Sequence, residues 1–384
     1  MKLKHILSIT SLAVCLAICS VANAQTRHKV VSLVKQQQTN EWYTEQAKLW
    51  GDYLKSNPKD ADAWLNYYTA NRMLKIQAQT KTQDDLDKLV KEMEKAIPNS
   101  FEYHYICYWN DGFREAEENF PHLQKAYELA PNRPETFDDF FSYYLVRDDQ
   151  TKLKELAEKW MKSNDISAGI YAWNYNMLMS CEPNAILITH GDNDTYPALI
   201  LQLAKNIRPD IVVMNNSLLL VDAYRNAHFA KAGIKLMSTD FSAFKSYEEL
   251  TNALYGHIIE NRGERPLCFG MGFNTDEFTL LKDKVFNVGM AWKYSEEKFD
   301  NIAVIKKNFE KYFMLDYLKH SFSNDISQGV VNYLSCNYLA AMLTLFNHYC
   351  ESEDPKADEL KVLINNIAEI NNIQDQVKDV LKGK

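Results

Sequence analysis

The stretch from Asn184 to Asp222 constrains the fold more than any other part of the chain. A short apolar run at Ala185–Ile188 ends in a polar turn at Gly191, and Pro197 stands where the first residue of a helix is expected. A second apolar run follows and ends in another polar turn. Two strands joined by a crossover helix lie parallel in one sheet, so both turns open on one edge, where open α/β sheets bind ligands.

Polar side chains gather in these two turns and form the candidate ligand-binding set. They are Asp192, Asn193, Asp194, Asn215, Asn216, Ser217 and Asp222. Asp276 follows a later predicted strand, next to Asn274, Thr275 and Glu277. If that strand is parallel to the first, Asp276 joins the same rim.

The block GDNDTYP has three interpretations, all of which stay open at the level of sequence. In the first, Gly191 makes a tight turn and Asp194 or Thr195 caps the helix, which stabilises it by about 1 kcal/mol but accounts for one residue only. In the second, Asp192 and Asp194 chelate a divalent cation, helped by Asn193 or His190. In the third, the two aspartates bind sugar hydroxyls or a peptide amine.

The same block carries a family resemblance. GDNDTYP followed by IRPDIVVMNNSLL resembles the soluble C-terminal region of a bacterial family of multi-pass membrane proteins. The membrane half of that family is similar to protein O-mannosyltransferases. The resemblance continues more weakly to about residue 318, and no stretch of this chain matches the membrane half. The resemblance therefore implies that this chain is an accessory of envelope glycosylation. It does not imply glycosyl transfer by this chain.

The first 24 residues predict a signal peptide. A positive start precedes an apolar core, and a small-residue cleavage site stands before Gln25. Bulky Ile18 argues against lipidation of Cys19, and the core is short for an uncleaved anchor, the rival interpretation. We expect export to the periplasm or cell envelope. No later segment is expected to span a membrane, since the nearest candidate, residues 333–346, is too short.

Charge and cysteine content exclude several classes of partner and site. The formal net charge is −8 at pH 7, and loss of the signal's two lysines makes the chain more acidic, which argues against nucleic acid or an anionic membrane surface. The other cysteines fit neither a disulfide framework nor a zinc pattern. Buried free thiols are expected, with a Cys336–Cys350 bridge as the alternative; the five are Cys107, Cys181, Cys268, Cys336 and Cys350.

Residues 25–182 repeat a helical pattern in which Pro58, Pro98 and Pro131 each follow a helix. Pro98 and Pro131 are separated by nearly one period of about 34 residues, so this part resembles tetratricopeptide repeats. Aromatic residues recur at helical spacing, and we expect them to fill the seams between helices. An aromatic groove for a peptide or glycan is the alternative. They are Trp64, Tyr67, Tyr68, Tyr103, Tyr105, Tyr108, Trp109, Phe140, Phe141, Tyr143 and Tyr144.

Residues 183–298 alternate strands and helices, and residues 299–384 return to a helical pattern. Strands are predicted near 185–190, 210–215, 234–237, 266–271 and 285–290, and helices at 197–206, 218–231 and 246–261. The predicted fold is a tetratricopeptide-like helical solenoid, then a small, mainly parallel α/β sheet domain, then a helical C-terminal region.

Catalytic signatures are sparse. No Gly-x-Ser-x-Gly elbow occurs, Gly270 and Gly272 make an incomplete dinucleotide motif, and no phosphate cradle accompanies the two aspartates. We expect no cofactor, except that a divalent cation is possible. The leading prediction is a non-catalytic binding or scaffold protein, whose repeats hold a protein or peptide and whose rim binds a polar ligand, a glycan being one candidate. The alternatives are a pure scaffold and a metal-assisted hydrolase or transferase built on Asp192, Asp194, Asp276 and His190.

Overall fold

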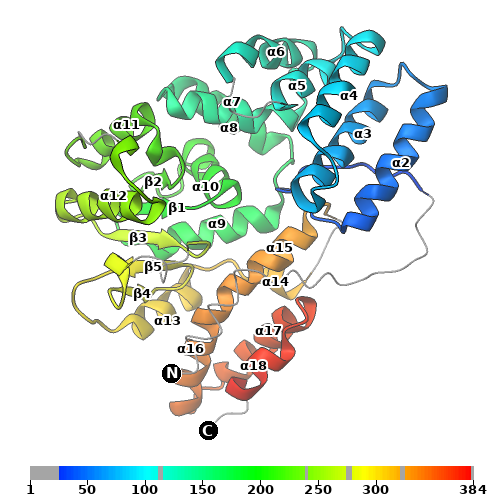
Figure 1. Ribbon diagram of the computed structural model, residues 1–384. Coiled ribbons are helices and arrows are strands. Elements are labelled where there is room, and N and C mark those ends of the chain that lie inside the picture. The colour runs from blue at the N-terminus through cyan, green and yellow to red at the C-terminus, as the bar shows by residue number, and fades with distance from the viewer. Residues whose placement is uncertain (1–25, 111–115, 238–240, 274–278, 321–324, 382–384) are drawn as a thin grey trace. The chain divides into compact units, whose positions relative to one another are not determined.

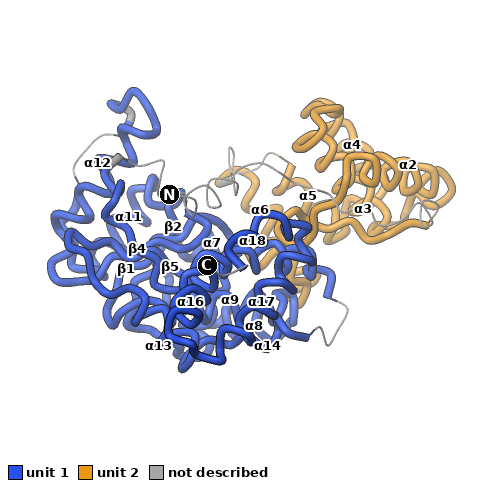
Figure 2. Tube along the Cα trace, turned by 90° about the horizontal axis from the view of Figure 1, so that it is seen from below, with its two compact units in different colours: residues 1–13, 140–384 blue, residues 14–139 orange. Residues whose placement is uncertain are grey.

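The computed structural model describes residues 26–110, 116–237, 241–273, 279–320 and 325–381. These residues form two compact units, 26–139 and 140–381, coloured separately in Figure 2. The residues on both sides of the predicted boundary at 182 lie in the second unit, because the helix before it packs on the helix after it.

The unit of residues 26–139 is helical, and helices that are neighbours in sequence pack together, as α2 does with α3 and α5 with α6. The three prolines named above each follow a helix, as predicted. The elements are α2 (Asn40–Ser56), α3 (Ala61–Met73), the π-helix η2 (Leu74–Ala78), α4 (Gln83–Ala96), α5 (Phe101–Asn110), α6 (Ala116–Leu129) and the 3-10 turn η4 (Pro134–Thr136).

Aromatic side chains fill much of the core of this unit. Trp64, Tyr68 and Tyr105 are buried in one cluster with Leu86 and Met93. None of the eleven aromatic residues predicted to lie in helical seams is exposed: six are buried and five are half-buried. The packing interpretation is therefore confirmed for these side chains.

One five-stranded sheet lies in the unit of residues 140–381 (Figure 1). Its strand order is β2-β1-β3-β5-β4, with β2, β1 and β3 parallel and with β5 antiparallel to both β3 and β4. In the parallel part, Ile186 of β1 pairs with Val212 of β2 and Leu267 of β3. The strands are β1 (Ile186–Thr189), β2 (Val212–Asn215), β3 (Leu267–Gly270), β4 (Val285–Asn287) and β5 (Ala291–Tyr294).

Helices surround this sheet because its central strands are apolar on both faces; every residue of β1 and β3 is buried. Helices α10 and α11 contact β2, and Tyr255 of α12 packs edge-on against Phe269 of β3 at 5.7 Å between ring centroids. The helices up to the last strand are α7 (Phe137–Val146), α8 (Gln150–Lys162), α9 (Ala168–Ser180), α10 (Asp192–Lys205), α11 (Asp222–Ala232) and α12 (Tyr247–Asn261). Short 3-10 turns are η5 (Leu218–Leu220), η6 (Phe241–Ala243) and η8 (Thr279–Leu281).

The sheet corrects two predictions. Residues 234–237 form no strand: Ile234 is buried, but Leu236 on the same alternating face is 62% exposed, so the segment has no continuous apolar face to bury in a sheet. Residues 285–290 are not one strand, because Gly289 has a φ of +122° and turns the chain between β4 and β5. The sheet is therefore mixed, whereas a mainly parallel sheet was predicted.

The C-terminal region is helical, as predicted, and packs on α9. Asn176 of α9 donates a hydrogen bond to the Met314 carbonyl at 2.9 Å, and Trp173 Nε1 donates to the Leu334 carbonyl at 3.2 Å. Its elements are α13 (Asn301–Lys311), α14 (Asp316–Lys319), α15 (Gln328–Ser335), the 3-10 turn η9 (Cys336–Tyr338), α16 (Leu339–Glu351), α17 (Lys356–Ile370) and α18 (Gln374–Leu381).

Elements α15, η9 and α16 form one helical stretch of 24 residues, Gln328–Glu351. Within the described residues, this stretch alone is long and apolar enough to cross a membrane. The predicted candidate, residues 333–346, is part of this longer helical stretch, so the prediction that it is too short was wrong. Half of it is buried inside the structure, and the core helix of a soluble protein meets the same criterion.

Candidate functional site

The acidic turn joins β1 directly to α10. The helix begins at Asp192, with Gly191 as its N-cap. Pro197 therefore lies inside the helix, and the prediction that it is the first helical residue was wrong. A proline there removes the hydrogen bond that the carbonyl of Asn193 would otherwise accept. Asn174 of α9 replaces it, because its Nδ2 donates to the Asn193 carbonyl at 2.7 Å.

Asp194 caps the helix from its third position. Its carboxylate accepts hydrogen bonds from the backbone N–H of His190 at 2.8 Å and of Gly191 at 2.7 Å, the acidic half of a capping box. The side chain is buried, and this burial raises the pKa of Asp194, while the two backbone hydrogen bonds oppose the rise. Both carboxylate oxygens therefore serve the turn itself.

Gly270, the last residue of β3, and Gly272 lie against this carboxylate. A Cβ at Gly270 would lie 3.4 Å from Asp194 Oδ2 and 3.1 Å from Met177 Sδ, and a Cβ at Gly272 would lie 3.6 Å from the same oxygen. Gly191 itself is in an extended conformation, with a φ of −132°, so its backbone does not require glycine. The Gly-x-Gly motif thus admits a buried aspartate, and the dinucleotide interpretation is not needed to explain it.

A hydrogen-bond network ties the ends of β1 and β2 together below the rim. The Thr195 hydroxyl donates to the Gly191 carbonyl at 2.6 Å and contacts the Thr189 hydroxyl at 2.7 Å. Asn215 donates from Nδ2 to Thr195 at 2.9 Å and accepts the backbone N–H of Leu218 at 3.0 Å. Asn215 is buried, so the structure uses it to join two strands.

Asn216 is buried as well and links the rim to α12. Its backbone N–H donates to the Thr189 carbonyl at 2.8 Å, and its Nδ2 donates to the Tyr247 hydroxyl at 3.0 Å. Its Oδ1 accepts from the Tyr255 hydroxyl. These contacts hold the half-exposed ring of Tyr247 at the rim.

Asp222 begins α11 and forms an ion pair with Arg225. The Arg225 guanidinium is buried, donates to the Leu219 carbonyl at 3.0 Å and lies 4.2 Å from the ring centre of Phe241. A buried cation needs a partner charge, so Asp222 stabilises the fold although its own side chain is exposed.

Asp192 differs from the other candidates. Its side chain is exposed, and it makes no hydrogen bond or ion pair with any residue that the structure describes. Desolvation by the surrounding protein nevertheless raises the pKa of Asp192. His190 and Ser217 are also exposed at this rim, and Asn193 is half-buried. Asp276 lies outside the described residues.

Metal-ligating side chains do not gather at this rim in the described part of the chain. Across that part, no three or more His, Cys, Asp or Glu side chains are grouped so that they could hold a metal ion. The five cysteines have free thiols, with Cys181 and Cys268 buried and Cys350 exposed, so Cys336 and Cys350 are not bridged in this structure.

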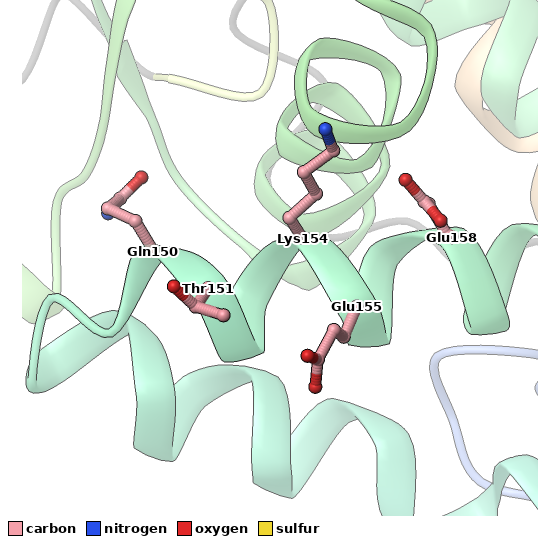
Figure 3. A pocket seen from close by; sticks show the side chains of 5 residues that line it. All are labelled: Gln150, Thr151, Lys154, Glu155 and Glu158. Carbon is pink, nitrogen blue, oxygen red and sulfur yellow. The ribbon is translucent and has the colours of Figure 1, made fainter.

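A surface depression of about 370 Å³ lies along α8 (Figure 3), and no residue of the acidic turn lines it. Five side chains of this one helix line it: Gln150, Thr151, Lys154, Glu155 and Glu158. Four of them are exposed, and the set combines one cation, two carboxylates and two uncharged polar side chains, which is typical of a solvated helix face. The depression therefore does not compete with the rim as a candidate site.

Comparison with known families supports the resemblance seen in the sequence. Residues 170–234 match the family model of TMEM260-associated domain 2. No curated protein matches the chain at a significant level. The matched residues run from α9 to the end of α11, so they contain β1, the acidic turn, β2 and Asp222.

Sequence reasoning missed several residues that build the rim. Asn174 lies in an earlier helix, and nothing in the local sequence connects it to Pro197. Tyr247 likewise accepts a hydrogen bond from Asn216, which is distant in sequence, and Arg225 donates to the carbonyl of Leu219 in the preceding 3-10 turn. Gly270 and Gly272 did carry a usable signal, because glycines directly after a buried strand indicate close approach of another group.

Proposed function

We propose that the chain is an exported, non-catalytic binding protein of the cell envelope, and that the exposed side of the acidic turn contacts its ligand. The observation that carries the proposal is that the block GDNDTYP contains both buried side chains that stabilise the turn and an exposed one that does not. Asp194 and Thr195 are buried in hydrogen bonds of the fold, whereas Asp192 is exposed and unpaired among the described residues. An exposed carboxylate without a partner in the described structure is free to accept hydrogen bonds from a bound donor.

The rim offers recognition chemistry rather than a catalytic set. Asp192 can accept hydrogen bonds from sugar hydroxyls or a peptide amine, and the exposed ring of Tyr247 supplies an apolar surface fixed by Asn216. General acid–base or metal-assisted catalysis needs a second group within reach of the same reacting atom. Asp194 does not supply that group, because its two oxygens already bind backbone N–H groups.

The helical unit supplies the second part of the proposal. The packing of α2 on α3 and of α5 on α6, the aromatic seams and the prolines after α2, α4 and α6 support a tetratricopeptide-like solenoid that holds a protein or peptide. TMEM260-associated domain 2 is linked to TMEM260, a mannosyltransferase-like protein. By extension, we propose that this chain assists envelope glycosylation, with a glycan or glycosylated protein as its ligand. The acidic charge supports neither nucleic acid nor an anionic membrane surface as partner.

Asp192→Asn is expected to reduce capture of the partner from an envelope extract by about tenfold, since a charge-assisted hydrogen bond contributes about 1.5–3 kcal/mol. The measurement is affinity capture by the full chain, quantified by mass spectrometry. The matched control is Asp375→Asn, which changes an exposed first-turn aspartate of α18. Equal recovery of every captured component by Asp192→Asn and by the control would rule out the rim as the binding surface.

A further inference from the structure

Two histidines of the unit of residues 26–139 face each other across neighbouring helices. The Nδ1 atoms of His104 in α5 and His122 in α6 lie 2.9 Å apart, and the ring centroids are 5.0 Å apart with planes at 38°. Tyr103 packs edge-on against both rings, at 5.3 and 6.0 Å between centroids. Because α5 and α6 pack together, the fold holds the two nitrogens in this position.

Burial lowers the pKa of both imidazoles, which favours their neutral forms. Burial lowers the pKa of His104, and the neighbouring His122 and Lys125 lower it further. Burial also lowers the pKa of His122, with Glu94 opposing that change. A neutral imidazole has one nitrogen with a lone pair. In the pair as it stands, one Nδ1–H donates to the other Nδ1. If that proton moves to Nε2, both Nδ1 atoms carry a lone pair, and a small rotation of the rings directs both lone pairs at an ion beside the line that joins the nitrogens.

We infer that His104 and His122 form a two-nitrogen binding site for a divalent transition metal ion. A bond from imidazole to such an ion is about 2.0–2.1 Å long, so two bonds at a right angle place their nitrogens about 2.9 Å apart. The observed separation is the same, and the ion would lie to one side of the line that joins the nitrogens. Imidazole suits Zn²⁺, Ni²⁺ and Cu²⁺, whereas Mg²⁺ and Ca²⁺ prefer oxygen ligands.

Water would complete the coordination of the ion. The two histidine side chains are half-buried, so one side of the pair is open to solvent. The described residues provide no third His, Cys, Asp or Glu grouped with them. Cys107 stands one turn after His104, but its thiol interacts with the Tyr103 hydroxyl. Two protein ligands and an open side are typical of an exchangeable ion rather than a closed structural zinc site.

The test is calorimetric titration of the full chain, without a histidine tag, with NiCl₂ and ZnCl₂. One ion per chain is expected. His104→Gln and His122→Gln should each weaken binding by about tenfold or more, since even an outer-shell partner of a metal ligand contributes about 10–100-fold. The control His348→Gln changes a histidine of α16 outside the pair and should leave the affinity unchanged. CaCl₂ and MgCl₂ should give no binding.

Electron paramagnetic resonance of the Cu²⁺-loaded wild-type chain gives a second readout that needs no variant to fold. Two coordinated imidazole nitrogens are expected. A spectrum with one nitrogen or none would overturn the inference. So would wild-type Ni²⁺ and Zn²⁺ affinities weaker than about 1 mM, or affinities unchanged in both histidine variants, with circular dichroism showing that those variants are folded.

Discussion

Replacing Arg208 with alanine is expected to lower the free energy of unfolding by about 2–4 kcal/mol, because it removes a half-buried guanidinium together with its hydrogen bonds to three carbonyls and one carboxylate. The guanidinium donates to the carbonyls of Leu178, Cys181 and Glu182, each at 2.9 Å, and so binds the end of α9 to the loop before β2. It also forms a two-point ion pair with Asp210, at 3.0 and 2.9 Å. Chemical denaturation of the full chain measures the loss.

Two control variants separate the contribution of the Arg208 side chain to stability from that of its backbone conformation. Arg208 has a φ of +48°, so Arg208→Gly should lose about 1 kcal/mol less than Arg208→Ala, because glycine adopts this conformation without strain. Arg208→Lys keeps the charge but loses the planar fork, and most of the loss should remain. A loss below about 1 kcal/mol for Arg208→Ala would contradict this account of the loop.

The same ion pair predicts a pH dependence. The hydrogen bonds from Arg208 lower the pKa of Asp210 to about 2 from its ordinary 3.8. A carboxyl group with a lowered pKa in the folded state stabilises the fold above its unfolded pKa and loses that contribution as the pH falls through the folded value. The Asp210 contribution should therefore disappear between about pH 4 and pH 2, and Arg208→Ala should abolish this part of the acid dependence.

Asp194→Ala is expected to have the second large effect, a loss of about 2–4 kcal/mol, because it leaves the backbone N–H groups of His190 and Gly191 without their acceptor and empties a buried side-chain position. Asp194→Asn keeps one acceptor oxygen but directs its NH₂ group at the other donor, so about half of the loss should remain. Asp192→Asn should stay within about 0.5 kcal/mol of the wild type, since that side chain is exposed. Equilibrium unfolding of the three variants gives the comparison.

The outcome that would reverse these assignments is a stable Asp194→Ala protein beside a destabilised Asp192→Asn protein. In that case Asp192 would be the capping residue, and the exposed carboxylate of the turn would be Asp194.

The three parallel strands and the helices α10, α11 and α12 could be predicted from sequence, because local signals specify them. Short apolar runs that end in glycine or polar residues indicate buried strands, and Gly233 marks the end of α11 with a φ of +70°. The hairpin of β4 and β5 could not be predicted in the same way. Gly289 turns the chain there, but a glycine among apolar residues is equally compatible with the interior of a strand.

The position of the rim was predictable, whereas the role of each polar residue was not. Strand order and the polar turns place Asp192, Asp194, Asn215 and Asn216 at one edge, as the structure has them. Whether an aspartate faces solvent or the core depends on groups far away in sequence. Asp194 is buried against Gly270 of β3, where a Cβ would lie 3.4 Å from its Oδ2.

Pro197 illustrates the same limit. Its place in the helix interior contradicts local propensity, which favours proline in the first turn. The compensating donor, Asn174, belongs to another helix and is identified only once α9 and α10 pack together.

The central claim, that the rim around Asp192 is the ligand-binding surface, is tested most directly by photocrosslinking in cells. A photoreactive amino acid replaces Ser217, which is exposed beside the turn and makes no contact that the fold needs in the described structure. The account predicts a crosslink to one envelope component, lost when Asp192→Asn is added and absent when the photoreactive residue replaces Asp375 instead. An unchanged crosslink in the Asp192→Asn background, or none at all from position 217, would contradict it.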